Sequence, residues 1–547
     1  MAVAQPYAIP CEGGLDKSSS SFSLLRKPGS ATKLRNFEVG IAGGYRRING
    51  FSVLGGSSAA RPNSSNPILG LHVYADGVIA CSGTNIYFSQ DGESWLQINM
   101  GSVSGSGDNY STFTGRTAAA RTSQNTAHFA TYEGDTDYGE VIITDEGSGI
   151  SPFYFKMTGT GSALSSRTYY AKTLTVGDGS VYPKFCTIHD KHLVVGGAAT
   201  APNTIYYSGT SDIDSFSSSG SGNIVLDDQV VGLRSFRDDL IIFCRNSIWK
   251  LSNINNEDTI AVSPITQNIG CLDGKSIQEI GGDLVFLAPD GIRTLAGTAR
   301  IGDVELGTVS KPIQTIVKDI ADNINTYTIS SLVIRDKSQY RLYYGNTGTG
   351  GVSEGIVGTL RQAEQGFITF EWSETFGIDA SSAITSGFNS SGIEKYYHGD
   401  YAGYVYNHDT GTSFNRAGVE SNIVAEYKTP DFDYGDLGTS KTLKYLRLSI
   451  TPEGDIAPSI RVRYDYEDQD IPQPTDIAAS VPKPSLFGDA TFGSAGGYTF
   501  GASVTPLTRH NILGSGHSNN FKIFSDDVKA SYTINGLYVN YVPSGRR

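Results

Sequence analysis

Residues 190–208 read DKHLVVGGAATAPNTIYYS, and the same pattern recurs as DDLIIFCRNSIWKLS at 238–252 and as GDLVFLAPDGIRTLA at 282–296. Each segment has a short apolar run, then a turn, and then a second run in which apolar and polar residues alternate. Alternation with a period of two is typical of a half-buried β-strand, and turn residues between two such runs indicate a hairpin. The middle of the chain therefore repeats one β-hairpin pattern.

The spacing of these hairpins predicts a β-propeller. Their second strands begin at Ile205, Ile248 and Ile292, in steps of 43 and 44 residues. Propeller repeats of four strands are about 40–50 residues long. Each blade buries little apolar surface alone, so blades are stabilised by stacking on their neighbours around a central axis.

Looser copies extend the pattern toward both ends of the chain. They are DGVIACSGTNIYFS (76–89), TAHFATYEGDTDYGEVIIT (126–144), KSQYRLYYGN (337–346) and IEKYYHGDYAGYVYNHD (393–409). With these copies the sequence predicts about six or seven blades. A large β-sandwich is the alternative fold, because its strands also come at regular spacing.

The whole chain is predicted to be all-β and to have three parts. These are a basic N-terminal arm and hairpin (1–60), a β-propeller (61–420) and a C-terminal β-sandwich (421–547). The 65 Gly, 31 Tyr and 24 Phe residues suit many short strands joined by turns. Residues 471–501 contain many Pro and Gly residues and are expected to be an extended loop. The best helix candidate is KPIQTIVKDIADNIN at 311–325.

Composition argues against several classes of protein. The net charge of −13 disfavours general nucleic-acid binding, although an acidic wall would not retain a duplex that passes it. The five cysteines are dispersed and form no CxxC pair, which favours free thiols and synthesis in a reducing cytoplasm. No apolar run reaches about 18 residues, so we expect no membrane anchor. The first residues also lack the basic and apolar regions of a secretory signal.

One motif is similar to a turn found in enzymes. SQDGESW (Ser89–Trp95) resembles the Asp-box turn of sialidases and other propellers, but it occurs once and is one residue short between Asp and Gly. We expect Asp91 to accept hydrogen bonds from the amides of the turn, while Trp95 packs into the blade. A glycosidase needs two opposed carboxylates, and no spacing in the sequence singles out such a pair.

Acidic turns and a histidine pair are the candidate metal ligands. The turns are EGDTDYGE (133–140), DFDYGD (431–436) and DYEDQD (465–470), and none has the spacing of an EF-hand. His189 and His192 lie close in sequence without a third zinc ligand. The sequence also has no phosphate-binding P-loop and no G-x-S-x-G motif. We therefore expect no enzyme activity, no catalytic residues, no cofactor and no metal.

Three parts of the sequence resemble phage tail proteins. The segment GGLD…LLRKPGSATKLRNFEVGIAGGYRRINGF resembles the start of the tail nozzle proteins (tail tubular protein B) of short-tailed bacteriophages. The succession IYYSGTSDIDSF, VVGLRSFRDDLIIFCRNSIWKL and SIQEIGGDLVFLAPDGIRTL resembles both that family and the tail hub, or packaged-DNA stabilisation, proteins. The C-terminal YVNYVPSGRR is similar to the last module of such proteins.

The resemblance implies a structural protein of the virion tail that is made and assembled in the cytoplasm of a bacterial host. It implies a homohexamer below the portal and its tail adaptor protein, with tail fibres or spikes nearby. Such a nozzle or hub would retain packaged DNA and conduct it during ejection, with transient passage of double-stranded DNA and no sequence-specific binding. The alternative is a carbohydrate-active or receptor-binding propeller of a tail fibre or spike.

Basic residues near both chain ends are the candidates for the assembly interface. They are Arg46 and Arg47 in the N-terminal hairpin, and Arg546 and Arg547 at the C-terminus. We expect both pairs to be exposed and to dock on a partner, preferably a protein. The alternative interpretation is a solvated charged face.

Overall fold

The computed structural model describes residues 4–56, 61–63, 66–98, 125–134, 137–159, 164–300, 308–346, 353–362, 368–479, 481 and 507–546. Strand accounts for 53% of the structure and helix for 6%, which confirms the predicted all-β class. The short helices are α1 (Ser21–Leu24), α2 (Leu295–Arg300) and α3 (Gln314–Asp322). The last of these, with a preceding 3₁₀ turn at Lys311–Ile313, coincides with the helix predicted at 311–325.

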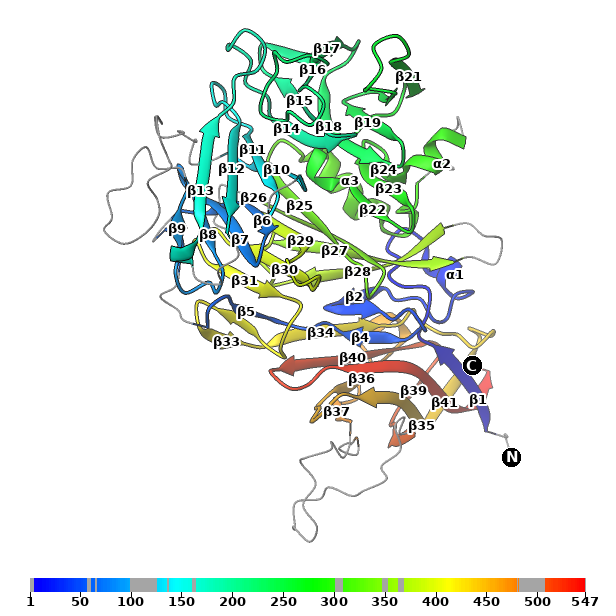
Figure 1. The fold of residues 1–547 in the computed structure, drawn as a ribbon. Coiled ribbons are helices and arrows are strands. Elements are labelled where there is room, and N and C mark those ends of the chain that lie inside the picture. The colour runs from blue at the N-terminus through cyan, green and yellow to red at the C-terminus, as the bar shows by residue number, and fades with distance from the viewer. Residues whose placement is uncertain are drawn as a thin grey trace.

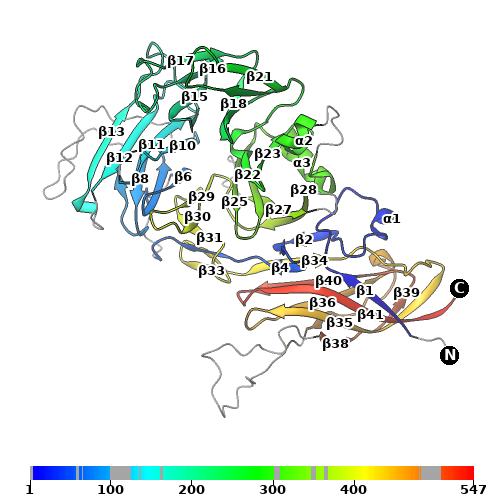
Figure 2. The ribbon, with the colours of Figure 1, turned by 45° about the vertical axis from the view of Figure 1, so that its right-hand side comes forward.

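Four antiparallel sheets of four strands each form blades, and they follow one another along the chain (Figures 1 and 2). The first is β6 (Ile68–Tyr74), β7 (Gly77–Ser82), β8 (Asn85–Ser89) and β9 (Leu96–Gln97). The second is β10 (Ala127–Tyr132), β11 (Glu140–Asp145), β12 (Phe153–Thr158) and β13 (Thr168–Thr173). The third is β14 (Phe185–His189), β15 (His192–Ala198), β16 (Ala201–Tyr207) and β17 (Gly222–Val225). The fourth is β18 (Val230–Phe236), β19 (Asp239–Cys244), β20 (Ile248–Ser252) and β21 (Ala261–Thr266).

Two further small sheets bring the number of separate blades to six, and this confirms the predicted propeller. The fifth is β22 (Gln278–Ile280), β23 (Asp283–Ala288) and β24 (Gly291–Thr294). The sixth is β29 (Ala383–Phe388), β30 (Glu394–Gly399), β31 (Val405–His408), β5 (Phe51–Val53), β32 (Phe414–Arg416) and β33 (Val419–Ser421). In this last sheet, β5 comes from the N-terminal part of the chain and pairs with β31.

The sector between the fifth and sixth blades is filled by part of a larger sheet. Its strands are β25 (Tyr327–Ile334), β26 (Gln339–Asn346), β27 (Glu354–Gln362) and β28 (Ile368–Phe376). Strand β25 contacts β22 on one side and β29 on the other, and β29 contacts β6, so the ring is closed. The same sheet continues through β2 (Lys33–Arg35), β34 (Ile423–Lys428), β40 (Asn519–Asp527), β36 (Ser459–Tyr464) and β37 (Ile477–Ala478).

A seven-stranded sheet joins the two ends of the chain. Its strands are β1 (Gln5–Pro10), β3 (Phe37–Val39), β4 (Tyr45–Arg47), β35 (Thr439–Pro452), β38 (Leu507–Asn511), β39 (Ser515–Gly516) and β41 (Tyr532–Arg546). Both β1 and β4 pair with β41, so the N- and C-termini lie close together (Figure 1). A separate C-terminal sandwich is not confirmed, because the C-terminal strands share their two sheets with N-terminal strands and with a propeller sector.

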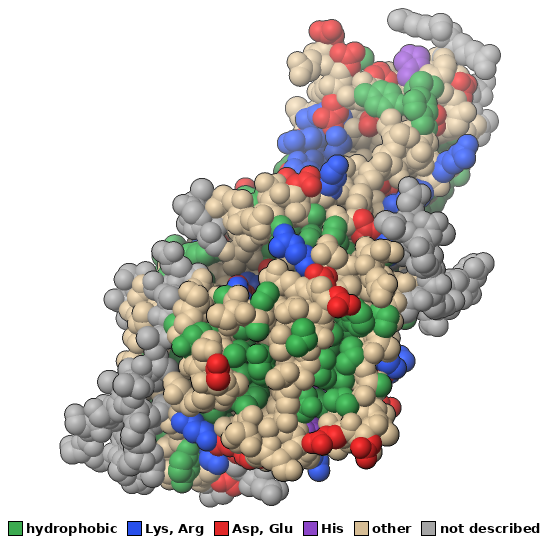
Figure 3. Space-filling view, turned by 90° about the horizontal axis from the view of Figure 1, so that it is seen from above, with side chains coloured by type: hydrophobic (Ala, Val, Ile, Leu, Met, Phe, Trp, Pro, Cys, Tyr) green, Lys and Arg blue, Asp and Glu red, His purple; other side chains and the backbone are tan. Residues whose placement is uncertain are grey.

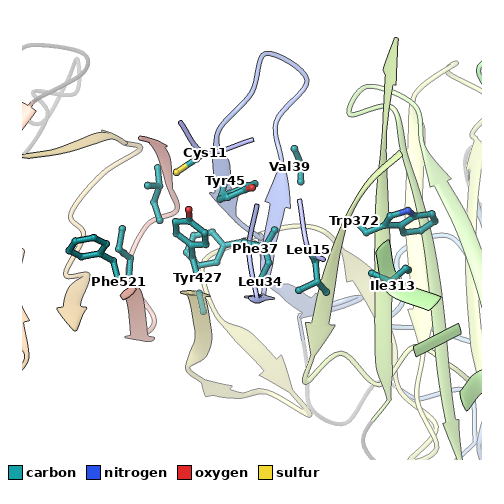
Figure 4. Packing of buried hydrophobic residues seen from close by; sticks show 14 of the residues in the cluster. Cys11, Leu15, Leu34, Phe37, Val39, Tyr45, Ile313, Trp372, Tyr427 and Phe521 are labelled. Carbon is teal, nitrogen blue, oxygen red and sulfur yellow. The ribbon is translucent and has the colours of Figure 1, made fainter. Parts of the chain in front are cut away.

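The largest apolar core lies where the propeller meets these terminal strands. It contains Leu34 and Phe37 from the N-terminal segment, Trp372 from the propeller, and Tyr427 and Phe521 from the C-terminal strands, each essentially inaccessible to solvent (Figure 4). The backbone also packs closely here. Gly14 has a φ of +65°, and a Cβ at this position would lie 2.7 Å from the Trp372 backbone nitrogen. Glycine is therefore required at Gly14 both for its conformation and for space.

All five cysteines are buried. Burial raises the pKa of Cys11, Cys244 and Cys271 to about 12 and that of Cys186 to about 11. Because the thiolate is the reactive form, these thiols act as small apolar core groups rather than as nucleophiles or ligands.

Candidate functional site

The innermost strands of the propeller surround an axial cavity of about 230 Å³. Different sectors of the ring each contribute a polar side chain to its lining. They include His72 of β6, His128 of β10, Arg234 of β18, Gln278 of β22, Ser331 of β25, and Lys275 of the 3₁₀ turn that precedes β22. Stacking of blades around one axis is therefore what brings these residues together.

Basic and acidic side chains are distributed differently around the axial cavity. Arg234 and Lys275 line it, and no Asp or Glu is among the described residues of the lining. Glu146 lies behind His128, with 2.8 Å between its Oε1 and the histidine Nε2. Burial raises the pKa of Glu146, but Lys275 and His128 lower it by more, so that the pKa falls well below its usual range. Desolvation lowers the pKa of His72 to about 4, so this ring is neutral near pH 7.

This lining does not suit glycoside cleavage. Both classes of glycosidase place two carboxyl groups on opposite sides of the scissile bond. The described lining of the axial cavity supplies cations, hydroxyls and amides instead.

The SQDGESW turn has the structural role predicted for it. Asp91 Oδ1 accepts hydrogen bonds from the backbone amides of Glu93 and Ser94 at 2.8 and 3.1 Å. Trp95 is half-buried against the core between the first and sixth blades, and its indole N–H donates to the Gly92 carbonyl. Both observations confirm the interpretation of this motif as a turn.

The acidic turns use carboxylates to hold backbone amides. Asp433 and Asp436 accept from Gly435 and Gly438. Asp465 accepts from the amides of His517 and Ser518. In the turn at 133–140, residues 135–136 lie outside the described residues.

Neither histidine of the IHDKHL segment has the surroundings of a metal ligand. His189 Nδ1 lies 2.9 Å from the Ser235 hydroxyl, and His192 Nε2 lies 2.9 Å from Asn255 Oδ1. Within the described part of the chain, no group of three or more His, Cys, Asp or Glu side chains is placed to hold a metal ion.

The predicted assembly residues have different surroundings. The side chain of Arg47 is only 1% exposed, and its guanidinium pairs with Asp527 at 2.8 Å, so the expectation of exposure is wrong for this residue. Arg46 is partly exposed and pairs with Glu38 and Glu453. The sequence shows a cluster of like charges but not the carboxylates that reach it from distant segments. An assembly role for Arg46 and Arg47 stays a prediction.

The C-terminal pair is only partly described. The backbone of Arg546 ends β41 and pairs with Thr439 of β35. Its side chain and the whole of Arg547 lie outside the described residues.

The structure contains a buried ionic cluster that the sequence does not reveal. It consists of Glu38 of β3, Lys337 of the β25–β26 turn, Arg341 of β26 and Asp409, which directly follows β31. Arg341 Nη2 lies 2.9 Å from Glu38 Oε2 and 3.2 Å from Asp409 Oδ1. Lys337 Nζ lies 3.0 Å from Glu38 and 2.6 Å from Asp409. In the sequence these residues are single charged side chains within ordinary strand patterns. Only the fold, which brings them into contact, identifies them as one cluster.

The ionic cluster connects the N-terminal hairpin to two sectors of the propeller. The side chains of Arg341, Glu38 and Asp409 are 1%, 3% and 6% exposed. Burial raises the pKa of Asp409, but Arg341 and Lys337 lower it by more, so its carboxylate stays charged. His408 adjoins the cluster, with its Nε2 3.3 Å from Arg341 Nη1, and its other ring nitrogen faces His398. The arrangement is a structural junction in which Lys337 is the most exposed member.

Comparison with known proteins gives no family. No family model and no curated protein matches the chain. Among solved structures, the chain is similar to the extracellular domain of a hybrid two-component system of B. thetaiotaomicron, with 9% identity, a TM-score of 0.34, and coverage of 67% of this chain and 40% of that one. For the S. cerevisiae core factor the identity is 9%, the TM-score 0.37 and the coverage 69% and 58%. For the exo-β-1,3-galactanase of Phanerochaete chrysosporium the identity is 9%, the TM-score is 0.26, and the coverage is 86% of this chain and 95% of that one.

In the part of the chain that the structure describes, no helix is both long and apolar enough to cross a membrane.

Proposed function

We propose that this protein is a structural component of the short tail of a double-stranded DNA bacteriophage, a nozzle or hub. In this proposal six copies surround a channel that retains packaged DNA and conducts it during ejection. The sequence resemblance of the N-terminal segment and the blades suggests the role. The observation that carries it is the pairing of N-terminal strands with the propeller and with the C-terminal strands.

This pairing suits a wall that must withstand force. Strand β5 closes the last blade beside β31, although more than 300 residues separate the two in sequence. Strand β2 lies between β28 and β34, and β1 pairs with β41 over six residues. Pulling on either end would therefore load several ladders of hydrogen bonds together, because the described terminal strands β1, β2, β5 and β41 are all paired.

Transient passage of DNA fits the charge of the chain. The net charge is −13, and the face in Figure 3 shows acidic and basic side chains interspersed among uncharged ones. Retention of DNA by a protein depends on cations that neutralise phosphates and release counterions. A face with mixed charges, such as the one in Figure 3, would let a duplex slide past. The tail adaptor and the fibres or spikes are the proposed protein partners.

The alternative is a carbohydrate-active or receptor-binding propeller of a tail fibre or spike. The lining of the axial cavity disfavours the enzymatic version, since it lacks opposed carboxylates in its described part. Binding to a host receptor without catalysis remains a distinct outcome of the test below.

Copy number in purified particles of the source virus tests the proposal. Quantitative mass spectrometry would compare peptides of this chain with those of the portal protein in the same sample. We expect half as many copies as the portal, which is the ratio for a six-fold ring below it. Absence from the particle, or a copy number typical of trimeric fibres, would overturn the nozzle or hub assignment.

A further inference from the structure

Arg234 carries a charge that no carboxylate compensates among the described residues. Its Nη1 donates to the Leu233 carbonyl at 3.2 Å, and its Nη2 donates to the Ile277 carbonyl at 3.3 Å. A guanidinium has five N–H donors in a planar fork, so further donors are left over. The groups that act on it electrostatically are the thiols of Cys186 and Cys271. Desolvation lowers the pKa of Arg234, as expected for a cation without a counter-charge.

The position of Arg234 directs this charge toward the propeller axis. Arg234 and Lys275 both line the axial cavity, while the carboxylates that act on Lys275, Glu146 and Asp273, are not part of the lining. The cavity thus presents positive charge inside a chain whose net charge is −13. Its volume of about 230 Å³ lies below the roughly 300–1,000 Å³ of sites for drug-sized ligands. The space therefore suits a small ion rather than a sugar or a nucleotide.

We propose that the axial cavity is a binding site for a small oxyanion of the phosphate type, held by Arg234 with Lys275. A guanidinium binds two oxygens of such an anion through parallel N–H donors, and an ammonium adds a point charge. The unpaired edge of a sheet presents backbone N–H groups, which would add donors along the inner strands. Bound anion would link several sectors of the ring and neutralise the charge of Arg234. This inference does not depend on the proposed tail function.

Thermal unfolding of the full chain in inorganic phosphate tests the site. The reference is sodium chloride at the same ionic strength, and the variants are Arg234→Gln and the matched control Arg237→Gln. Arg237 is exposed just beyond the end of the same strand and is not part of the cavity lining. We expect phosphate to raise the unfolding temperature of the wild type and of Arg237→Gln, because a ligand of the folded state stabilises it. Arg234→Gln should lose this shift.

Line broadening of the phosphate ³¹P resonance gives a second measurement that does not depend on stability. We expect broadening by the wild type and by Arg237→Gln, and at least a tenfold weaker effect from Arg234→Gln. If Arg234→Gln does not fold, Lys275→Gln is measured in its place, with the same expectation. An equal effect in all variants, or no phosphate-specific effect in the wild type, would overturn the proposal.

Discussion

Glu38 is buried and faces the cations of Lys337 and Arg341, and Arg46 binds the same carboxylate. We expect Glu38→Gln to reduce the free energy of unfolding by about 3–5 kcal/mol, because removal of one partner leaves buried charge uncompensated. Denaturation in guanidinium chloride, followed by tyrosine and tryptophan fluorescence, measures the change.

The matched control for this change is Glu453→Gln. Glu453 binds the same Arg46 but is 41% exposed, so its ion pair should contribute less than about 1 kcal/mol. Equal losses for the two variants would show that burial of the ionic cluster does not determine its energy.

The paired histidines beside the ionic cluster predict a dependence of stability on pH. Burial lowers the pKa of His408 to about 3 and that of His398 well below its usual value. Unfolded histidine takes up a proton near pH 6.5, so the unfolded state binds more protons below that pH. The free energy of unfolding should therefore fall as the pH is lowered from about 6.5. Buried carboxylates such as Asp409 lose their contribution only below about pH 4.

Substitution of His398 isolates its share of this effect. We expect His398→Phe to reduce the slope of the free energy of unfolding between pH 5 and 6.5, by up to about 1.4 kcal/mol per pH unit. Phe414→Leu is the control, since Phe414 stacks on Phe51 in the same core without a titratable group. The control should lower stability without altering the slope. A slope unchanged in His398→Phe would contradict the assignment.

At the scale of elements, we expect the sixth blade, and through it the closed ring, to depend on the three residues of β5. Ser52 pairs with Asn407 at the centre of this short strand. We expect Ser52→Pro to break the pairing, because proline lacks the N–H donor and disrupts a central strand. Hydrogen exchange should show loss of protection in the sixth blade and in the first blade that contacts it through β29 and β6.

Asn223→Pro provides the contrast for the closure strand. Asn223 lies in β17, the outermost strand of the third blade. In this variant, the loss of hydrogen-exchange protection should be confined to the outer edge of the third blade. If both variants lost protection only locally, β5 would not be the closure of the ring.

The elements also show how far sequence reasoning reaches in this chain. Period-two alternation and turn residues predicted the hairpins, and steps of 43 and 44 residues predicted the blades, because both signals are local. The closing role of β5 and the burial of Arg47 were not predictable in this way. Their partners, β31 and Asp527, lie hundreds of residues away, and a local pattern does not record which distant strand pairs with which.

A comparison of the third blade with the sector formed by β25–β28 shows the same limit of prediction from local sequence. The third blade is a separate sheet of four strands, as its repeat predicts. The β25–β28 sector has the same hairpin pattern, yet its edge continues through β2 into the C-terminal strands. An exposed edge strand can pair with any compatible strand, so the boundary between propeller and terminal region depended on tertiary packing.

At the scale of the whole molecule, the size of the axial cavity limits where DNA would pass in the proposed tail. A cavity of about 230 Å³ is smaller than a site for a drug-sized ligand, so a duplex cannot thread a single propeller. If six copies form the proposed tail ring, the channel must lie between copies. We expect a cryo-electron microscopy map of the virion tail to show six propellers around the channel, each with its own axis beside the DNA path. DNA density along a propeller axis would contradict this arrangement. A six-fold ring whose propeller axes contain no DNA would instead show that the channel wall is formed by the outer surfaces of the blades or of the terminal sheets.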